Sequence, residues 1–154
     1  MMRSLARPHD RAAVLTRLRQ LRPDTARRWG RMTAPQMVCH LTDSFRGVLG
    51  ERSSGDPSKP APRWRQLIVR FVALYLPVRW PRGMKTRPAV DQESGGTPPG
   101  VFADDVVELT RVCERFATER TPRQAHYLLG DLSAAEWARW GYRHMDHHLR
   151  QFGL

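Results

Sequence analysis

Apolar side chains recur at intervals of three and four residues along most of the chain, which is the period of an amphipathic helix. The pattern predicts helices over residues 10–21, 34–49, 64–76, 105–118 and 134–151. No stretch alternates apolar and polar residues in the way that a half-buried strand does. The sequence therefore predicts an all-α fold.

Capping residues and loop composition define the ends of these helices. Thr33 and Ser133 each stand three residues before a Gln or Glu, the spacing of a capping box. Asp104 or Asp105 is the expected N-cap of the helix that follows residue 100. Proline and glycine are frequent in the intervening segments, where we expect loops without regular structure. These loops are residues 51–63, 81–100 and 121–131.

Four of the predicted helices are main helices, and a connection of about 50 residues separates the second from the third. A four-helix bundle with a long crossover between helices 2 and 3 fits this order. The short helix at 64–76 lies within the crossover. At 154 residues the chain is expected to form a single domain, residues 1–154.

The chain is basic, with 26 Lys and Arg against 15 Asp and Glu and a net charge of +11. The arginines are spread over most segments, so we expect no specific nucleic-acid binding. Segment 64–82 mixes tryptophans with arginines, and we expect a helix packed over the bundle with solvated arginines. The alternatives are a membrane-surface or nucleic-acid patch. If the histidines of the chain form a metal site, this segment and the loop 95–100 are candidates for a wall of its pocket, and the arginines would hold an anionic substrate.

Cysteine usage and hydropathy restrict the cellular compartments in which we expect the protein. Cys39 and Cys113 lie far apart, with no CxxC pair, so we expect two core thiols in a reducing, cytoplasmic setting. The longest apolar stretch, residues 71–78, is far shorter than the roughly 20 residues of a membrane span. We also find no signal peptide. The sequence thus predicts no membrane span, and it is compatible with a homodimer.

Three of the six histidines gather near the C-terminus. His144 and His148 are four residues apart, so on a helix they share one face. That face coincides with the inward apolar stripe that contains Trp137 and Met145. His147 falls at the edge of the stripe, and we expect it to hydrogen bond another helix.

Buried imidazoles need polar partners, and one divalent metal ion would satisfy His144 and His148 together. Hydrogen bonds inside the bundle are the alternative. His40 lies at the edge of the apolar stripe of the second helix and is a candidate third ligand, or else a core histidine. Three histidine ligands would leave a coordination position open for water or substrate, as in catalytic sites.

These residues resemble a known family. His40 in the second helix, followed by the run 144–151, is similar to the motifs of the DinB-like superfamily of metal-binding four-helix bundles. Shorter motifs in the same order support the likeness, which extends from Trp29 to the C-terminus: Trp29-Gly30, Gln36-Met37, Trp80-Pro81-Arg82-Gly83, Gly95-Gly96-Thr97 and Gly130. The resemblance is closest to an uncharacterised branch. It implies a bundle with a crossover and a metal site formed by His40, His144 and His148.

Relatives in that superfamily include metal-dependent enzymes that act with low-molecular-weight thiols. The resemblance implies one divalent ion, and imidazole ligands favour zinc or nickel. We therefore expect a metal-dependent hydrolase or thiol-dependent transferase with a small-molecule substrate. The alternatives are a non-catalytic metal-binding or stress-related protein and a basic nucleic-acid-binding accessory protein.

Two further residues are candidates for catalysis. Asp43 lies one turn after His40 and is expected either to orient a ligand imidazole or to pair with Arg46. His126 precedes the last helix and is expected either to contact substrate or to bond its own loop.

Overall fold

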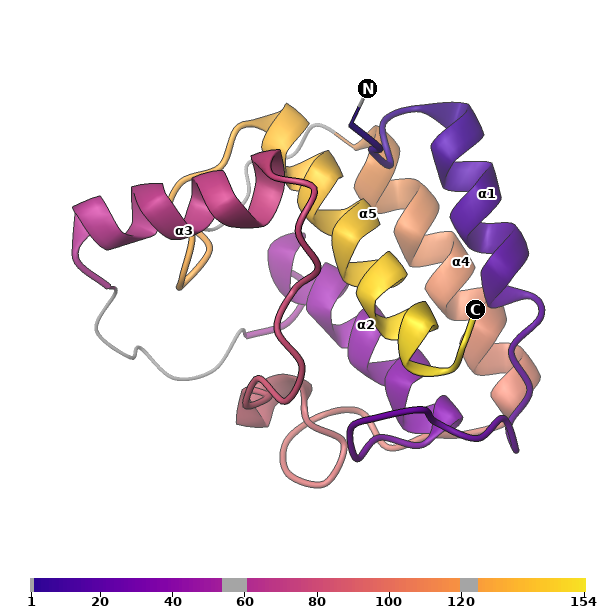
Figure 1. Cartoon of the computed structure of the whole chain (residues 1–154). Coiled ribbons are helices and arrows are strands. Elements are labelled where there is room, and N and C mark those ends of the chain that lie inside the picture. The colour runs from indigo at the N-terminus through magenta and orange to yellow at the C-terminus, as the bar shows by residue number, and fades with distance from the viewer. Residues whose placement is uncertain (1, 54–60, 120–124) are drawn as a thin grey trace.

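The computed structural model describes residues 2–53, 61–119 and 125–154, and it is helical (Figure 1). Parts of two predicted loops, residues 54–60 and 121–124, lie outside the described residues. The helices are α1 (Pro8–Leu18), α2 (Ala34–Val48), α3 (Arg63–Tyr75), η1 (Pro88–Val90), α4 (Phe102–Thr118) and α5 (Ala134–Gln151).

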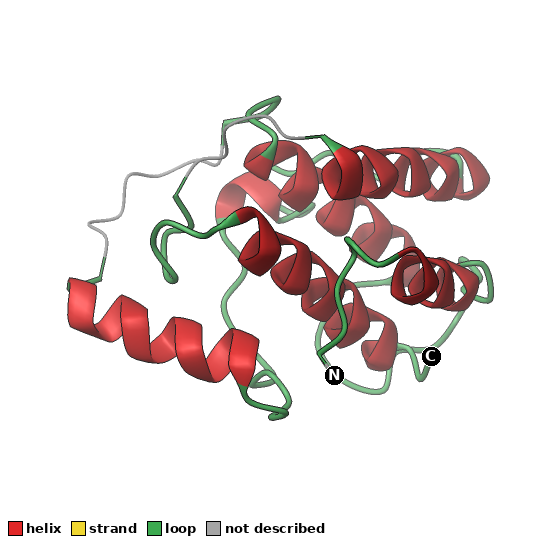
Figure 2. Cartoon of the chain, turned by 90° about the horizontal axis from the view of Figure 1, so that it is seen from above, coloured by secondary structure: helices red, strands yellow, loops and turns green. Residues whose placement is uncertain are grey.

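Helices α1, α2, α4 and α5 form a bundle, and α3 lies apart from it in the crossover between α2 and α4 (Figures 1 and 2). This confirms the predicted all-α bundle and its crossover. Across the three described ranges the structure has no strand, only an isolated bridge between His126 and Gly130. No helix in these ranges is both long and apolar enough to cross a membrane.

The bundle is held together by apolar stripes that face one another. The ring of Phe45 in α2 lies 4.7 Å from that of Phe116 in α4, and Trp140 of α5 meets Phe45 edge-on at 6.0 Å. Gly141 allows this close approach, because a Cβ there would lie 2.7 Å from both Leu5 and Phe116. Burying a large apolar side chain contributes about 1.5–3 kcal/mol, so these contacts supply much of the stability.

Both predicted capping boxes are present. The Thr33 hydroxyl accepts a hydrogen bond from the Gln36 amide, and the Gln36 side chain accepts one from Thr33. Ser133 and Glu136 make the equivalent pair at the start of α5. These caps fix where α2 and α5 begin, and therefore the phase of the histidines along them.

The predicted N-cap of α4 is wrong, because this helix begins earlier. Its N-cap is Val101, and Asp104 and Asp105 lie in the first turn. Asp105 accepts a hydrogen bond from the Gly100 amide at 2.9 Å. Carboxylates in the first turn are favoured by the helix dipole, so the acidic pair stabilises the start without capping it.

The end of α1 and the structure of segment 81–100 also differ from the prediction. Helix α1 ends at Leu18, and residues 19–21 turn away from it. Leu21 is still buried, so the apolar periodicity of the sequence continues past the end of the helix. A short 3₁₀ helix, η1, forms inside the 81–100 segment. The amides of Asp91 and Gly95 donate to the Pro88 carbonyl and close this turn.

Helix α3 contacts the bundle mainly through its C-terminal half. Tyr75 donates to Glu136 at 3.1 Å, and the Trp80 indole donates to the Ala73 carbonyl at 3.0 Å. Arg143 of α5 donates to the Leu76 carbonyl at 2.6 Å. Within α3 only Leu74 is buried, so the prediction of a helix packed along the bundle is correct for one end only.

Candidate metal centre

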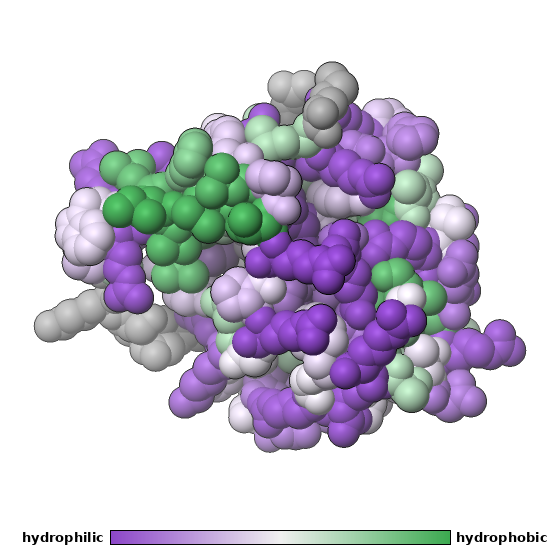
Figure 3. All heavy atoms as spheres, viewed as in Figure 1, coloured by the Kyte–Doolittle hydropathy of each residue, from purple (hydrophilic) through white to green (hydrophobic). Residues whose placement is uncertain are grey.

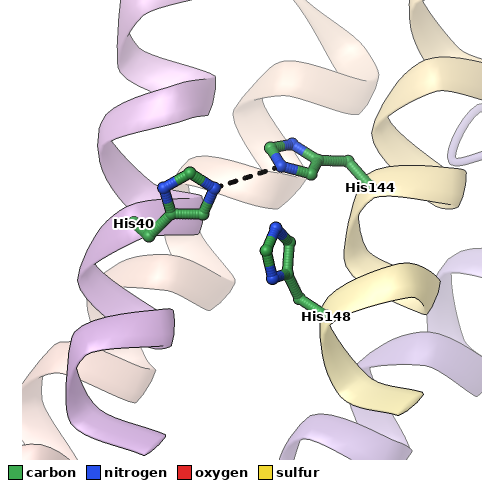
Figure 4. A group of neighbouring side chains, drawn as sticks. All are labelled: His40, His144 and His148. Atoms are coloured by element: carbon green, nitrogen blue, oxygen red, sulfur yellow. Dashed lines mark hydrogen bonds between the residues drawn. The ribbon is translucent and has the colours of Figure 1, made fainter. Parts of the chain in front are cut away.

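His40 of α2 and His144 and His148 of α5 meet between the two helices, with their rings pointing toward one another (Figure 4). The Nε2 atoms of His40 and His144 are 3.3 Å apart. One nitrogen from each of the three rings lies within 4.8 Å of the others. The structure thus brings together the three histidines that the sequence singled out.

The predicted faces of the two helices account for this arrangement. His144 and His148 lie one turn apart on the inner side of α5, beside the fully buried Met145, and each is 9% exposed. His40 is 6% exposed. Their placement follows from the apolar periodicity of α2 and α5, since the histidines share the buried stripes.

Val90 fixes the orientation of the His40 ring. The Nδ1 of His40 donates to the Val90 carbonyl at 2.7 Å. A carbonyl only accepts, so the proton lies on Nδ1 and the lone pair of Nε2 points toward the other two rings. Hydrogen bonds of this kind orient metal-binding histidines and increase the basicity of the nitrogen that binds.

Gln151 has the same role for His148. The Nδ1 of His148 donates to the Gln151 Oε1 at 3.1 Å, and Gln151 is buried. Gly30, at φ +80°, makes room for this amide, because a Cβ there would overlap the Gln151 Nε2. The Trp29-Gly30 motif therefore contacts the histidine cluster through Gln151.

The cluster is uncharged at neutral pH. Burial lowers the pKa of His40, and it lowers the pKa values of His144 and His148 well below their usual range, with the neighbouring imidazoles adding to the effect. Neutral imidazole is the form that binds metal ions. The Nδ1 of His144 is buried without a hydrogen-bond partner among the described residues.

The geometry fits a metal ion. Two imidazole nitrogens bound to one tetrahedral zinc ion at about 2.0–2.1 Å lie about 3.3 Å apart. The Nε2 atoms of His40 and His144 already have this separation. The three imidazoles are buried and neutral, and hydrogen bonds to Val90 and Gln151 orient the rings of His40 and His148. With small adjustments of His148, the three rings can hold a divalent ion.

A large cavity opens onto the cluster. Its volume is about 1200 Å³, and His40, His144 and His148 form part of its wall. Most of the remaining wall is apolar, including Trp29, Trp80, Trp137 and Trp140, and it has basic residues at Arg31, Arg65, Arg79, Lys85 and Arg87. Segment 64–82 contributes to the wall as expected, whereas the loop 95–100 does not.

Asp43 does not reach the imidazole of His40, and it does not pair with Arg46. Its carboxylate is fully buried and accepts hydrogen bonds from the Thr97 amide and hydroxyl, both at 2.7 Å, and from Gln92 and Arg52. These bonds fasten the loop after η1 to α2. Asp43 therefore holds the crossover that carries Val90, the acceptor of the His40 Nδ1 proton.

His126 lies in the cavity wall and also bonds its own loop. Its Nδ1 accepts from the amides of Leu128 and Leu129 at 3.1 and 3.2 Å. Burial and the nearby Arg87 lower the pKa of His126 to about 4. With Nδ1 occupied as an acceptor, the neutral ring carries its proton on Nε2, so His126 is a hydrogen-bond donor at neutral pH.

His147 is not one of the three converging histidines, although its ring meets that of His148 edge-on with the centroids 5.1 Å apart. It also packs against tryptophan rings. Its ring centroid is 4.8 Å from Trp29 and 6.0 Å from Trp80. The expected hydrogen bond to another helix is absent among the described residues, where the ring contacts aromatic side chains instead. Burial lowers the pKa of His147 to about 4, so it too is neutral.

Sequence reasoning missed two residues that hold the histidines. Gln151 had a detectable signal, since it lies three residues after His148 on the same helix. Val90 had none, because a backbone carbonyl has no residue-specific signature and this one is 50 positions from His40.

The fold and the site define a helical-bundle protein with a buried three-histidine cluster beside a large cavity. The chain belongs to a family described as "Protein of unknown function (DUF1569)", whose family model matches residues 2–153. No curated protein and no solved structure matches the chain significantly.

Proposed function

We propose that this protein is a metal-dependent enzyme that holds one divalent ion on His40, His144 and His148. The observation that supports the proposal is the convergence of three neutral imidazoles at the wall of a cavity. Zinc or nickel suits a set of imidazole ligands. The motif likeness to the DinB-like superfamily agrees with this proposal and forms part of it.

The access of the cluster to the cavity supports an enzyme rather than a closed structural site. The described residues supply three candidate ligands, and closed structural zinc sites use four. A divalent ion bound in this way lowers the pKa of a water or thiol and so supplies a nucleophile at neutral pH. The proposed reaction is hydrolysis or thiol-dependent transfer on a small molecule.

The chain's own residues would bind and orient that substrate. The tryptophans exclude water from an apolar part of the molecule, and Arg79 and Lys85 attract an anionic group. His126 donates a hydrogen bond from Nε2. A reducing cytoplasmic setting is part of the proposal, and the two buried, unpaired thiols are compatible with it.

Elemental analysis of the purified protein tests the metal site. We expect about one ion per chain, and a steep loss of metal in His40→Ala, His144→Ala and His148→Ala, because two imidazoles hold an ion poorly. His147→Ala should keep its metal, as should a variant at the exposed His9. A His147→Ala protein without metal beside a His144→Ala protein with full metal would contradict the ligand assignment.

A spectroscopic experiment separates enzyme from structural site. In protein loaded with cobalt, 2-mercaptoethanol should give a sulfur-to-cobalt charge-transfer band if the ion has an open position that faces the cavity. The absence of any spectral change with thiol, or with azide as an anionic probe, would show a closed site and contradict the proposed activity.

A further inference from the structure

Helix α3 exposes a row of large apolar side chains. Trp64, Leu67, Phe71 and Tyr75 follow one another at intervals of three and four residues, so they form one stripe along the helix. Their exposed fractions are 66%, 50%, 56% and 37%. Figure 3 shows hydrophobic surface gathered over α3. In the bundle helices such stripes face inward, whereas this one faces solvent.

The apolar surface continues from this stripe toward the cavity. Ile68 and Val72 lie on the adjoining face of α3, are 56% and 39% exposed, and form part of the cavity wall. Val78 extends the same surface beyond the helix. Contiguous exposed apolar surfaces of this kind mark sites of interaction with proteins or membranes.

Every charge within the segment that carries this surface is positive, and the Glu136 carboxylate of α5 lies beside it, 3.6 Å from Arg70. Residues 61–90 contain no Asp or Glu. Their basic residues are Arg63, Arg65, Arg70, Arg79, Arg82, Lys85 and Arg87. Of these, Arg63 and Arg65 are exposed at the start of α3, and Arg65, Arg79 and Lys85 lie at the cavity wall beside Ile68 and Val72.

We propose that α3 docks this protein on the surface of a bilayer that contains anionic phospholipids. The helix would lie in the plane of the interface, with Trp64, Leu67 and Phe71 inserted among the acyl chains and the exposed arginines contacting the headgroups. Because α3 has 13 residues, it is long enough to lie on a membrane but not to cross one. This inference does not depend on the metal site.

The same observations disfavour other occupants of the surface. A second copy of the chain docked through α3 would bring two cationic segments together, with no carboxylate in residues 61–90 to neutralise them. A nucleic acid would satisfy the arginines but leave Leu67, Ile68 and Phe71 against phosphates and water. A bilayer with anionic headgroups satisfies both the charge and the apolar side chains.

Vesicle flotation of the full-length protein tests the proposal. We expect binding to vesicles of equal parts phosphatidylglycerol and phosphatidylcholine at about 0.1 M salt, weak binding to phosphatidylcholine alone, and release at high salt. Tryptophan fluorescence should shift to the blue as Trp64 enters the bilayer. Equal binding to both kinds of vesicle, or binding to neither, would overturn the proposal.

Matched variants separate the stripe from general adhesion. Phe71→Ser should lower the partition coefficient about tenfold or more, and Arg63→Gln about fivefold. The controls are Val107→Ser, on an exposed position of α4, and Arg19→Gln, at the end of α1 on the far side from α3 (Figure 1). All four positions are exposed, and circular dichroism checks that each variant folds. Equal losses in variants and controls would overturn the proposal.

Two further measurements address the rejected occupants. A concentration-dependent dimer that Phe71→Ser abolishes, without vesicle binding, would assign the stripe to a second copy and overturn the membrane proposal. Tight binding of a nucleic acid that Phe71→Ser abolishes, again without vesicle binding, would overturn it equally.

Discussion

The Nδ1 of His40 in α2 donates a 2.7 Å hydrogen bond to the carbonyl of Val90 in η1. The bond joins the bundle to the crossover and fixes which ring nitrogen carries the proton. The crossover thereby holds the lone pair of the His40 Nε2 toward His144 and His148. In a metal site of this kind, the residues behind the ligands decide how well an ion is held.

Gln151 provides the first test of this idea. Gln151→Met removes the acceptor of the His148 Nδ1 proton while keeping a side chain of similar volume. We expect the affinity for zinc to fall about 10–100-fold, the usual effect of losing such a partner. Competition with a chromophoric chelator measures the affinity. Gln20→Met, at an exposed position, is the control, and equal affinities in both variants would contradict the role of Gln151.

Gly30 and Gly50 form a matched pair for a second test. Both have a positive φ, +80° and +78°, but a Cβ at Gly30 would overlap Gln151, whereas one at Gly50 would meet nothing within 4 Å. Gly30→Ala and Gly50→Ala should each lower the free energy of unfolding by about 1 kcal/mol or more through backbone strain. Only Gly30→Ala should also weaken zinc binding, because it displaces Gln151. Chelator competition and urea denaturation separate the two effects.

Asp43 should matter for stability and should affect metal binding only indirectly. Asp43→Ala removes a buried carboxylate with four hydrogen bonds. It leaves the Thr97 amide and hydroxyl without their acceptor, while Arg52 keeps its bonds to the Thr97 hydroxyl and the Gly95 carbonyl. Leaving a buried donor without its acceptor costs about 1–3 kcal/mol. Urea denaturation measures it, with Glu93→Ala as the exposed control. A loss below 1 kcal/mol would show that the loop does not depend on Asp43.

Acid should destabilise the metal-free protein in a defined range. Burial lowers the pKa of His126 from its usual 6.5 to about 4. Below about pH 6.5 the unfolded chain therefore binds a proton at His126, whereas the native state does not bind it until the pH approaches 4. Native stability is therefore fully present above about pH 6.5 and falls toward pH 4. His126 alone accounts for about 2 kcal/mol by pH 5. Urea titrations at several pH values measure the slope, and constant stability between pH 7 and pH 5 would contradict the buried neutral histidines.

The sequence by itself determined the helices and their inward faces. The capping boxes at Thr33 and Ser133 and the apolar period of α2 and α5 placed His40, His144 and His148 on buried stripes. These features are local, since caps and periodicity involve residues within a few turns of one another. The bundle and the candidate triad were therefore predictable, and the convergence of the three rings agrees with that prediction.

Only the tertiary structure decided what surrounds the three histidines. The Val90 carbonyl, the direction of the Asp43 carboxylate and the exposure of the α3 stripe depend on how the crossover folds back on the bundle. An amphipathic pattern says that a helix has an apolar face, but it does not say what covers that face. The path of the crossover depends on contacts between residues about 50 positions apart, and no local pattern in the sequence encodes such contacts.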